Sequence, residues 1–182
     1  MSKALRSAVF IVLLSSVCAG VLAAIRFSTE ELVIQNEKTA LHRQVLAAFG
    51  LPGEVGDFDT RVETTRRDGR TSWRSIRSGA TAFRVSGMGF WAPIHAVVAV
   101  EADGKTIRGI RFFRHGETPG LGGRISEPWF MKQFEGKRLD VPIRVVMPGG
   151  GKGPNDVDAI TGATETSRKV EQLVDRIDPE PR

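Results

Sequence analysis

The chain of 182 residues has few of the side chains that form disulfides or metal sites. It contains one cysteine, Cys18, no tyrosine, and three histidines at His42, His95 and His115. A single cysteine excludes an internal disulfide and leaves a cysteine-based metal site without a second ligand. No two histidines have the i, i+4 spacing of a helical zinc site, so no metal centre is expected. Two interpretations of His115 stay open, a solvated loop residue or a group beside a redox centre.

The sequence also lacks a concentrated run of positive charge and a nucleotide phosphate loop. Its 26 Lys and Arg residues outnumber its 21 Asp and Glu residues, but the basic side chains are scattered among the acidic ones. Nucleic-acid binding is therefore not expected. The stretch "PGGGKGP" at 148–154 has Gly153 and Pro154 after Lys152, where a phosphate loop needs Ser or Thr. We interpret it as a surface loop.

Charge is absent altogether from one long segment near the N-terminus. The 19 residues from Ser7 to Ile25 carry no charge, and as a helix they would span about 28 Å, close to the hydrocarbon thickness of a bilayer. Lys3 and Arg6 precede this segment, and positive flanks tend to stay in the cytoplasm. The pattern predicts a single-pass anchor in a bacterial inner membrane, with the following domain on the periplasmic side. The alternative is a cleaved signal peptide ending at Ala23, which places the domain on that same side.

The segment after the anchor is expected to continue as a helix. "STEE" at 28–31 has the pattern of a capping box and leads into an apolar-periodic segment that should end at the Gly and Pro residues of 50–53. The polar stretch 54–78 is interpreted as a strand and a loop. The predicted organisation is a transmembrane anchor over 1–27, an extended helix or linker over 28–53, and one folded domain over 54–182.

Strand and helix patterns alternate in the rest of the chain. Residues 81–87 alternate apolar and polar side chains, and Asp103-Gly104 between two β-rich runs predicts a hairpin. A short helix near 125–134 has Pro128 in its first turn, a strand covers 138–146, and a last helix covers about 163–177. We therefore predict an α+β fold, with a twisted, mainly antiparallel sheet and helices packed on it.

The most informative motif is "DAITGATETS" at 158–167, in which four hydroxyl side chains follow one carboxylate. If the last helix begins here, Thr161 and Thr164 lie at its N-terminus, where free amides and the helix dipole favour an anion. The simpler interpretation is a Thr that caps the helix. A cap needs only one hydroxyl, however, and it does not explain Asp158. A related stretch, "SIRSGAT" at 75–81, has Ser75 in place of the aspartate.

A second motif, "HGETPGLGG" at 115–123, places four glycines and a proline in nine residues. Glycines let a backbone approach a flat ligand closely, because no side chain intrudes. Glycine-rich loops are also common as plain turns, so this loop alone supports a turn as well as a cofactor site.

Together these residues resemble a known family. The residues from Asp158 to Thr164 are similar to the motif D-x-x-[S/T]-G-A-[S/T] of FMN-binding domains. In that family a flavin transferase joins FMN through a phosphoester to the last Thr or Ser, which here is Thr164, whereas Thr81 in the related stretch is predicted to stay unmodified. "HGETPGLGGRI" resembles the flavin loop of the C subunit of the sodium-pumping NADH:quinone reductases and, more loosely, that of the G subunit of Rnf complexes. The implied cofactor-binding residues are Asp158, Thr161, Gly162, Ala163, Thr164, Glu117, Thr118, Gly120, Leu121 and Gly122.

The resemblance implies a function. It describes a membrane-anchored flavoprotein with covalent FMN that carries electrons one at a time within a sodium-pumping NADH:quinone reductase or a related complex. Its expected partners are the other subunits of that complex, the flavin transferase and membrane lipid. Glu117 and Thr118 are expected to bond to the flavin edge or to a neighbouring subunit. The alternatives are a stand-alone periplasmic flavin carrier or reductase, and a non-catalytic assembly subunit without flavin.

Overall fold

The structure is a computed structural model that describes residues 3–51, 55–67, 69–150 and 153–177. Contacts divide the chain into two compact units, residues 1–39 and 40–182, which are described separately. The folded part therefore begins inside the segment that the sequence predicted as an extended helix or linker.

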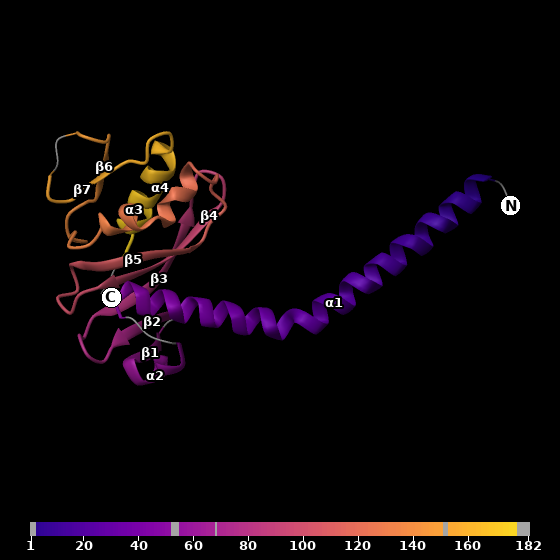
Figure 1. Ribbon diagram of the computed structural model, residues 1–182, viewed down its shortest axis with the longest axis horizontal. Helices are drawn as coiled ribbons and strands as arrows, with labels where there is room; N and C mark the ends of the chain where they lie inside the picture. The colour runs from indigo at the N-terminus through magenta and orange to yellow at the C-terminus, as the bar shows by residue number, and fades with distance from the viewer. Residues whose placement is uncertain (1–2, 52–54, 68, 151–152, 178–182) are drawn as a thin grey trace. The chain divides into compact units, whose positions relative to one another are not determined.

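One helix, α1, runs from Lys3 to Ala48 without interruption (Figure 1). The expected continuation of the helix beyond the anchor is confirmed. The capping box predicted at 28–31 is wrong, because the Ser28 hydroxyl donates to the carbonyl of Ala24 at 2.7 Å inside that helix. No glycine or proline occurs between Val21 and Ala48, so nothing in that sequence breaks the helix. The N-terminal part of α1 is exposed throughout and is apolar and long enough to cross a membrane.

The end of α1 belongs to the second unit. Val45, Leu46 and Ala48 are buried in its core together with the following Phe49. The helix stops at Ala48 and Gly50 adopts a positive φ of 66°, a conformation in which a Cβ would be strained. The predicted end of the helix at 50–53 is confirmed to within two residues by the described part of that stretch.

A five-stranded sheet forms the centre of the second unit. Its strands are β1 (Val62–Arg67), β2 (Arg70–Ser75), β3 (Thr81–Met88), β4 (Pro93–Val100) and β5 (Ile107–Arg114). They lie in sequence order, and each pairs with its neighbour in antiparallel fashion. The predicted antiparallel sheet is thus confirmed, although the stretch interpreted as one strand and a loop forms two strands and the short helix α2 (Phe58–Arg61).

The predicted hairpin joins β4 to β5. Gly104 has a positive φ of 69°, and one carboxylate oxygen of Asp103 accepts hydrogen bonds from the amides of Lys105 at 2.8 Å and Thr106 at 2.9 Å. These bonds satisfy the turn's free amides locally, because an aspartate can bond to backbone groups two or three residues ahead.

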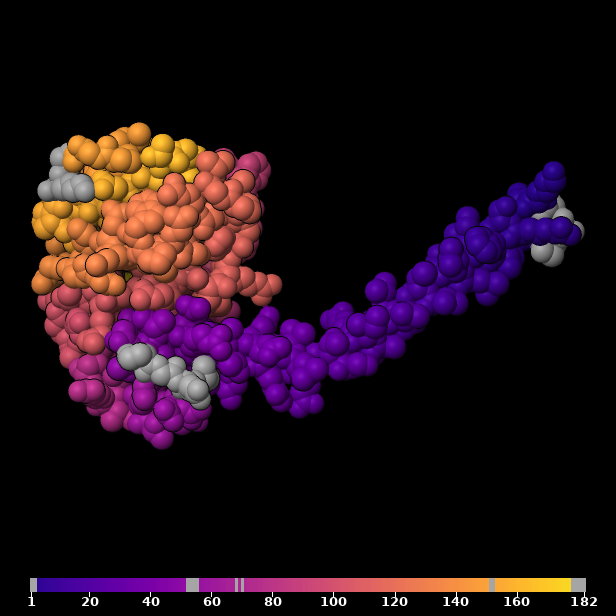
Figure 2. Space-filling view, in the orientation of Figure 1, coloured from indigo at the N-terminus to yellow at the C-terminus, as the bar shows by residue number. Residues whose placement is uncertain are grey.

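The two faces of the sheet are covered by different helices. On β4, Ile94, Ala96 and Val98 join a core cluster with α4 (Thr164–Val174), α3 (Pro128–Lys132) and the 3-10 helix η2 (Gly122–Ser126), whereas Val97 and Ala99 join a cluster with the end of α1 and with α2. The period of two residues sends successive β4 side chains to opposite faces, and both faces are apolar because both are covered. In Figure 2 the orange and yellow C-terminal half forms one side of this unit.

A small parallel pair, β6 (Arg144–Val146) and β7 (Asp156–Asp158), leads into α4. The strand predicted over 138–146 is confirmed only in its last three residues. In the preceding part Arg138 forms only an isolated antiparallel bridge with Thr106, and the Asn155 side chain accepts from the amide of Arg138 and donates to the carbonyls of Arg138 and Val141. The predicted helix near 125–134 divides into η2 and α3, with Pro128 in the first turn of α3 as expected.

Candidate functional site

The motif at 158–167 lies where β7 ends and α4 begins. Asp158 is the last residue of β7, Gly162 has a positive φ of 81° in the connecting turn, and Thr164 is the first residue of α4. The N-cap is Ala163, and no side chain caps the helix. The interpretation of a threonine as helix cap is therefore wrong, since alanine occupies the capping position and has no side-chain oxygen to accept a hydrogen bond.

The four hydroxyls of this motif fall into two pairs. Ser167 is buried, donates to the carbonyl of Ala163 and accepts from the amide of Ile160, both at 3.0 Å, and so holds the turn closed. Thr166 is also buried and donates at 2.7 Å to the carboxylate of Glu117, in the glycine-rich stretch 115–123 that we call the glycine loop. Among the described residues, the hydroxyls of Thr161 and Thr164 make no hydrogen bond. These two hydroxyls are free for a ligand or a modification.

Thr164 lies in the first turn of α4. The first helical bond runs from the amide of Ser167 to the carbonyl of Ala163 at 3.0 Å. The three amides of residues 164–166 consequently have no acceptor inside the helix and lie at its positive end. The half-buried Thr164 side chain is thus placed beside donors that suit a phosphate group.

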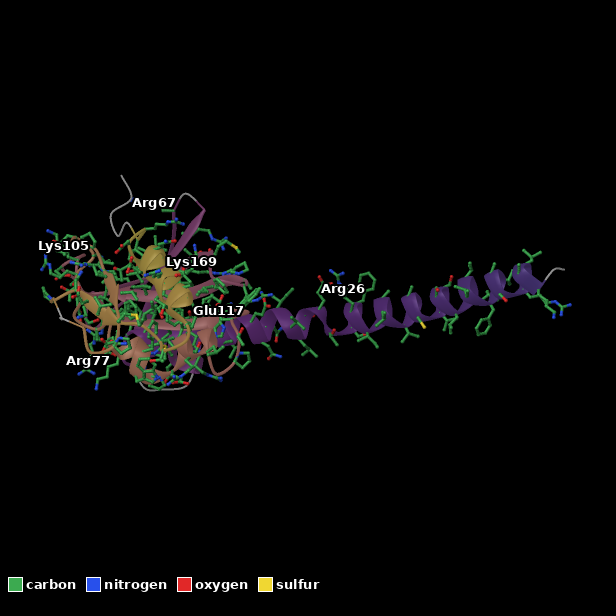
Figure 3. The ribbon with its side chains drawn as sticks, turned by 90° about the horizontal axis from the view of Figure 1, so that it is seen from above. Arg26, Arg67, Arg77, Lys105, Glu117 and Lys169 are labelled. Carbon is green, nitrogen blue, oxygen red and sulfur yellow. The ribbon has the colours of Figure 1, made fainter. Side chains whose placement is uncertain are left out.

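The glycine loop is tied to α4 by Glu117, which is 5% exposed. Its Oε1 accepts from the amides of Phe90 at 2.9 Å and Trp91 at 3.1 Å, and its Oε2 accepts from the Thr166 hydroxyl at 2.7 Å. Glu117 lies next to α4 in Figure 3. The carboxylate faces the protein interior. It therefore acts on a ligand only indirectly, by positioning the glycine loop, the backbone of residues 90–91 and the first turn of α4. We call Glu117 with its three donors the Glu117 latch.

Two glycines are required by this latch. A Cβ on Gly122 would lie 2.6 Å from the Thr166 hydroxyl and 2.8 Å from Oε2 of Glu117, and a Cβ on Gly89 would overlap Oε1 of the same carboxylate. Gly120 differs, because it has a positive φ of 75° and open space around it. Within the loop, Gly122 is therefore needed for close packing inside the protein, whereas Gly120 is needed for its backbone conformation.

The glycine loop also touches the turn that precedes Thr164. A Cβ on Gly162 would lie 3.1 Å from Cδ2 of Leu121, so these two motifs, which are about forty residues apart in the chain, meet in the fold. Leu121 is 46% exposed, while Phe90 and Trp91 are 52% and 68% exposed and form an edge-to-face pair with centroids 5.0 Å apart. Exposed large apolar side chains of this kind are available to cover an apolar ligand.

These residues fit a flat aromatic ligand that carries a phosphate. The free hydroxyl and helix amides at Thr164 suit the phosphate, and the exposed apolar side chains suit the ring. Of the predicted site residues, the structure brings together Glu117, Leu121 and Gly122 with Gly162. Ala163 is buried, whereas Thr118, Gly120 and Thr161 are exposed around the same turns.

Sequence reasoning missed the bonds that hold this site together. Thr166 is 49 positions from Glu117, and no single-sequence pattern pairs them. Gln133 was also missed; its side-chain amide bonds to the backbone of Asp158, accepting from the amide at 2.8 Å and donating to the carbonyl at 3.3 Å. Both partners are ordinary polar residues on other elements, and only the fold brings them close.

His115 and the second hydroxyl motif lie in different surroundings. The His115 Nε2 is 2.9 Å from the Ser126 hydroxyl and the ring is half-buried, so the interpretation of a solvated loop residue is not supported. Thr81 begins strand β3, and Ser75 is buried at the end of β2. The stretch at 75–81 is therefore a strand connection without a helix N-terminus, unlike the turn before Thr164.

Comparison with known proteins gives a match at this part of the chain. Residues 89–177 match the family described as the FMN-binding domain, which includes both the glycine loop and the turn before α4. Among curated proteins, the C subunit of the Na(+)-translocating NADH-quinone reductase from Yersinia pestis is 44% identical over 93 residues, which is 48% of this chain and 35% of that protein. The protein of the same name from Vibrio anguillarum is 43% identical over 97 residues, which is 50% of this chain and 38% of that protein. The matched region thus spans little more than a third of each relative.

Solved structures share the fold. NqrC from Shewanella oneidensis superposes with a TM-score of 0.66 at 23% identity, over 74% of this chain and 88% of that one. The C subunit of the Na(+)-translocating NADH-quinone reductase from Parabacteroides distasonis superposes with a TM-score of 0.67 at 24% identity, over 80% of this chain and 90% of that one. The predicted α+β fold and the resemblance noted in the sequence are both confirmed.

Proposed function

Because residues 89–177 match the FMN-binding domain family, we propose that this chain is a membrane-anchored flavoprotein. It carries electrons one at a time, as a subunit of a sodium-pumping NADH:quinone reductase or of a related membrane complex. FMN is attached through a phosphoester to the Thr164 oxygen by a flavin transferase. The domain lies on the periplasmic side of the bacterial inner membrane, and α1 anchors it.

The observation that carries this proposal is the state of the four hydroxyls near Asp158. Thr166 and Ser167 are buried and hydrogen-bonded within the protein. Thr164 has the correct place in the family motif, a half-buried side chain and a hydroxyl without a hydrogen bond among the described residues. It is therefore the hydroxyl that the fold leaves both accessible and oriented by a helix.

The first turn of α4 would hold the phosphate. The amides of residues 164–166 point toward the N-terminal end of the helix, where the helix dipole favours negative charge. Asp158 has a different part, since a carboxylate beside a phosphate repels it. We assign Asp158 to recognition by the transferase, with its backbone held in place by the Gln133 side chain.

Exposed apolar side chains would cover the ring. Leu121 lies against Gly162, two residues before Thr164, and the Glu117 latch holds the backbone of Phe90 and Trp91. Apolar cover excludes water and disfavours a charged form of a bound ligand. Thr118 is exposed in the same loop and is available to bond to the ring edge or to a neighbouring subunit.

When bound, FMN supplies the redox chemistry, accepting electrons from one partner and passing them to another. The protein holds the ligand, shields it and places it outside the membrane. A covalent bond suits that location, because a carrier outside the cytoplasm cannot replace a lost cofactor from cytoplasmic pools. The apolar helix before the domain keeps this carrier at the membrane surface.

The test is the intact mass of the full-length chain coexpressed with a flavin transferase. The wild type should be heavier than its amino acids by one FMN less one water, and its denatured band should fluoresce. Thr164→Ala should lose both signals and Thr164→Ser should keep them, while Thr161→Ala and Thr81→Ala should resemble the wild type. A wild type without added mass, or flavin on Thr81, would refute the assignment.

Two further outcomes distinguish the alternatives. A wild type without flavin that still copurifies with other membrane subunits would identify an assembly subunit. A flavinylated chain that purifies alone, with a mature N-terminus near Ala24, would identify a stand-alone periplasmic carrier.

A further inference from the structure

The outer edge of β3 is open over its second half. β2 pairs with β3 only from Ser72 opposite Phe83 to Arg74 opposite Thr81. Beyond that point the β1–β2 hairpin continues without β3, while β3 continues to Met88 paired only with β4. Residues 84–88 therefore present backbone groups on one side that no strand of the described chain pairs. An open edge of this kind can accept a further strand.

A cleft of about 590 Å³ runs along this edge. One wall is the β1–β2 hairpin, with Arg66 and Thr71, and the other is the end of α4, with Leu173, and the residues just after it, with Arg176. Figure 3 shows the hairpin, labelled at Arg67, projecting beside α4. Residues 84–88 would span roughly 17 Å as a strand, so the edge has room for a short extended segment.

The charged groups in this cleft are all basic. Arg66, Arg84 and Arg176 line it, and no acidic side chain does so among the described residues. None of the three arginines has an ion-pair partner in the described part of the chain. His95 also lines the cleft, but burial and the nearby Arg84 and Arg114 lower its pKa. The positive charge at neutral pH therefore comes from the arginines.

The two sides of the open edge differ in character. Phe83 and Val85 point to the face covered by α4, where Leu173 and Ile177 complete an apolar wall. Arg84 points to the opposite face, where its guanidinium lies 5.5 Å from the centre of the Phe113 ring. A strand added at this edge would thus place alternate side chains against an apolar wall and against arginine.

We propose that this cleft binds an extended segment of a partner protein, in which acidic and apolar side chains alternate, as an additional strand on β3. Backbone pairing supplies affinity, the arginines select acidic side chains, and the wall of α4 selects apolar ones. The cleft is separate from the turn before Thr164, and the inference does not depend on bound flavin.

The test uses full-length protein in nanodiscs of phosphatidylcholine and short fluorescent peptides. A peptide of alternating Glu and Val should bind, as measured by fluorescence anisotropy. The lysine-valine peptide should bind at least tenfold more weakly. The Glu-Val peptide with alternate amides N-methylated, which cannot pair with a strand, should also bind at least tenfold more weakly.

Matched variants locate the binding surface. Arg84→Glu and Arg176→Glu should each lower the affinity for the Glu-Val peptide at least tenfold. Arg67→Glu makes the same charge change outside the cleft lining and should change that affinity less than threefold. A wild-type tryptophan emission spectrum, to which the buried Trp73 contributes, confirms that each variant is folded.

Three results would overturn the proposal. If the N-methylated peptide bound as tightly as the unmodified Glu-Val peptide, strand addition would be excluded. If Arg67→Glu lost as much affinity as Arg84→Glu, the effect would come from net charge and not from the cleft. Binding to phosphatidylglycerol vesicles that Arg84→Glu abolishes, without binding of any peptide, would assign the cleft to lipid instead.

Discussion

Replacing Glu117 tests whether the site is held together by one buried carboxylate. Glu117 is 5% exposed and accepts three hydrogen bonds, from the amides of Phe90 and Trp91 and from the Thr166 hydroxyl. In Glu117→Ala these three donors lose their acceptor at once. Water can reach only part of the gap, since the Thr166 side chain is itself buried.

The expected loss can be worked from these bonds. A hydrogen bond to a charged group contributes about 1.5–3 kcal/mol, and removal of the carboxylate also removes its own cost of burial. We therefore expect Glu117→Ala to lower the free energy of unfolding by about 3 kcal/mol. For a domain of this size that corresponds to a fall in Tm of roughly 10 °C. Glu117→Gln keeps an acceptor for both amides and should lose only about 1–2 kcal/mol.

The assay is urea unfolding of full-length protein in detergent, followed by tryptophan fluorescence and analysed by linear extrapolation. The signal sums Trp73, Trp91 and Trp129, and Trp73, which is 3% exposed in the other core cluster, contributes the change that reports the whole domain. Glu165→Gln is the matched control, because its ion pair with Arg168 is more than half exposed and should contribute no more than about 0.5 kcal/mol.

A double-mutant cycle isolates the bond across the latch. Glu117→Gln combined with Thr166→Val should give a coupling of at least about 1 kcal/mol, because the two side chains share one buried hydrogen bond. Glu117→Gln should still gain the mass of FMN in the intact-mass assay, since the latch does not include Thr164. Stability of Glu117→Ala within about 0.5 kcal/mol of the wild type would refute the latch.

Three further predictions use the same unfolding assay. Gly122→Ala should lose about 2–3 kcal/mol because its Cβ would collide with the latch, whereas Gly120→Ala, which is strained but uncrowded, should lose only about 1 kcal/mol. Ser167→Ala should lose about 1–2 kcal/mol because a buried hydroxyl with two partners is removed, and Thr161→Ala, at an exposed position, should stay within about 0.5 kcal/mol. Hydrogen bonds from the hairpin turn lower the pKa of Asp103 from 3.8 to about 2, so the stabilisation of the fold by this carboxylate is present above pH 3.8 and is lost as the pH falls toward 2. The difference in the free energy of unfolding between wild type and Asp103→Asn should therefore shrink over that range. A constant difference would contradict this prediction.

Several features of this protein could be read from local sequence. Uncharged residues at 7–25 predict an apolar helix, and Asp103-Gly104 predicts a hairpin, because both depend on neighbours a few residues away. The motif around Thr164 is also local, since Asp158 to Thr164 are contiguous in the chain. The predicted helix start at Ser28 failed for a related reason: its capping pattern competes with a helix that is already propagating, and propagation adds a bond per residue without a new nucleus.

Only the tertiary structure decided how the site is held and which hydroxyls are free. The sequence presents Thr161, Thr164, Thr166 and Ser167 as equivalent side chains, and the fold buries two of them against partners elsewhere. The bond from Thr166 to Glu117 joins elements 49 residues apart, and its existence depends on how α4 packs on the sheet. The open edge of β3 also depends on the tertiary structure, because strand pairing determines where the β1–β2 hairpin separates from β3. The sequence of β3 alone does not indicate which of its residues lack a paired strand.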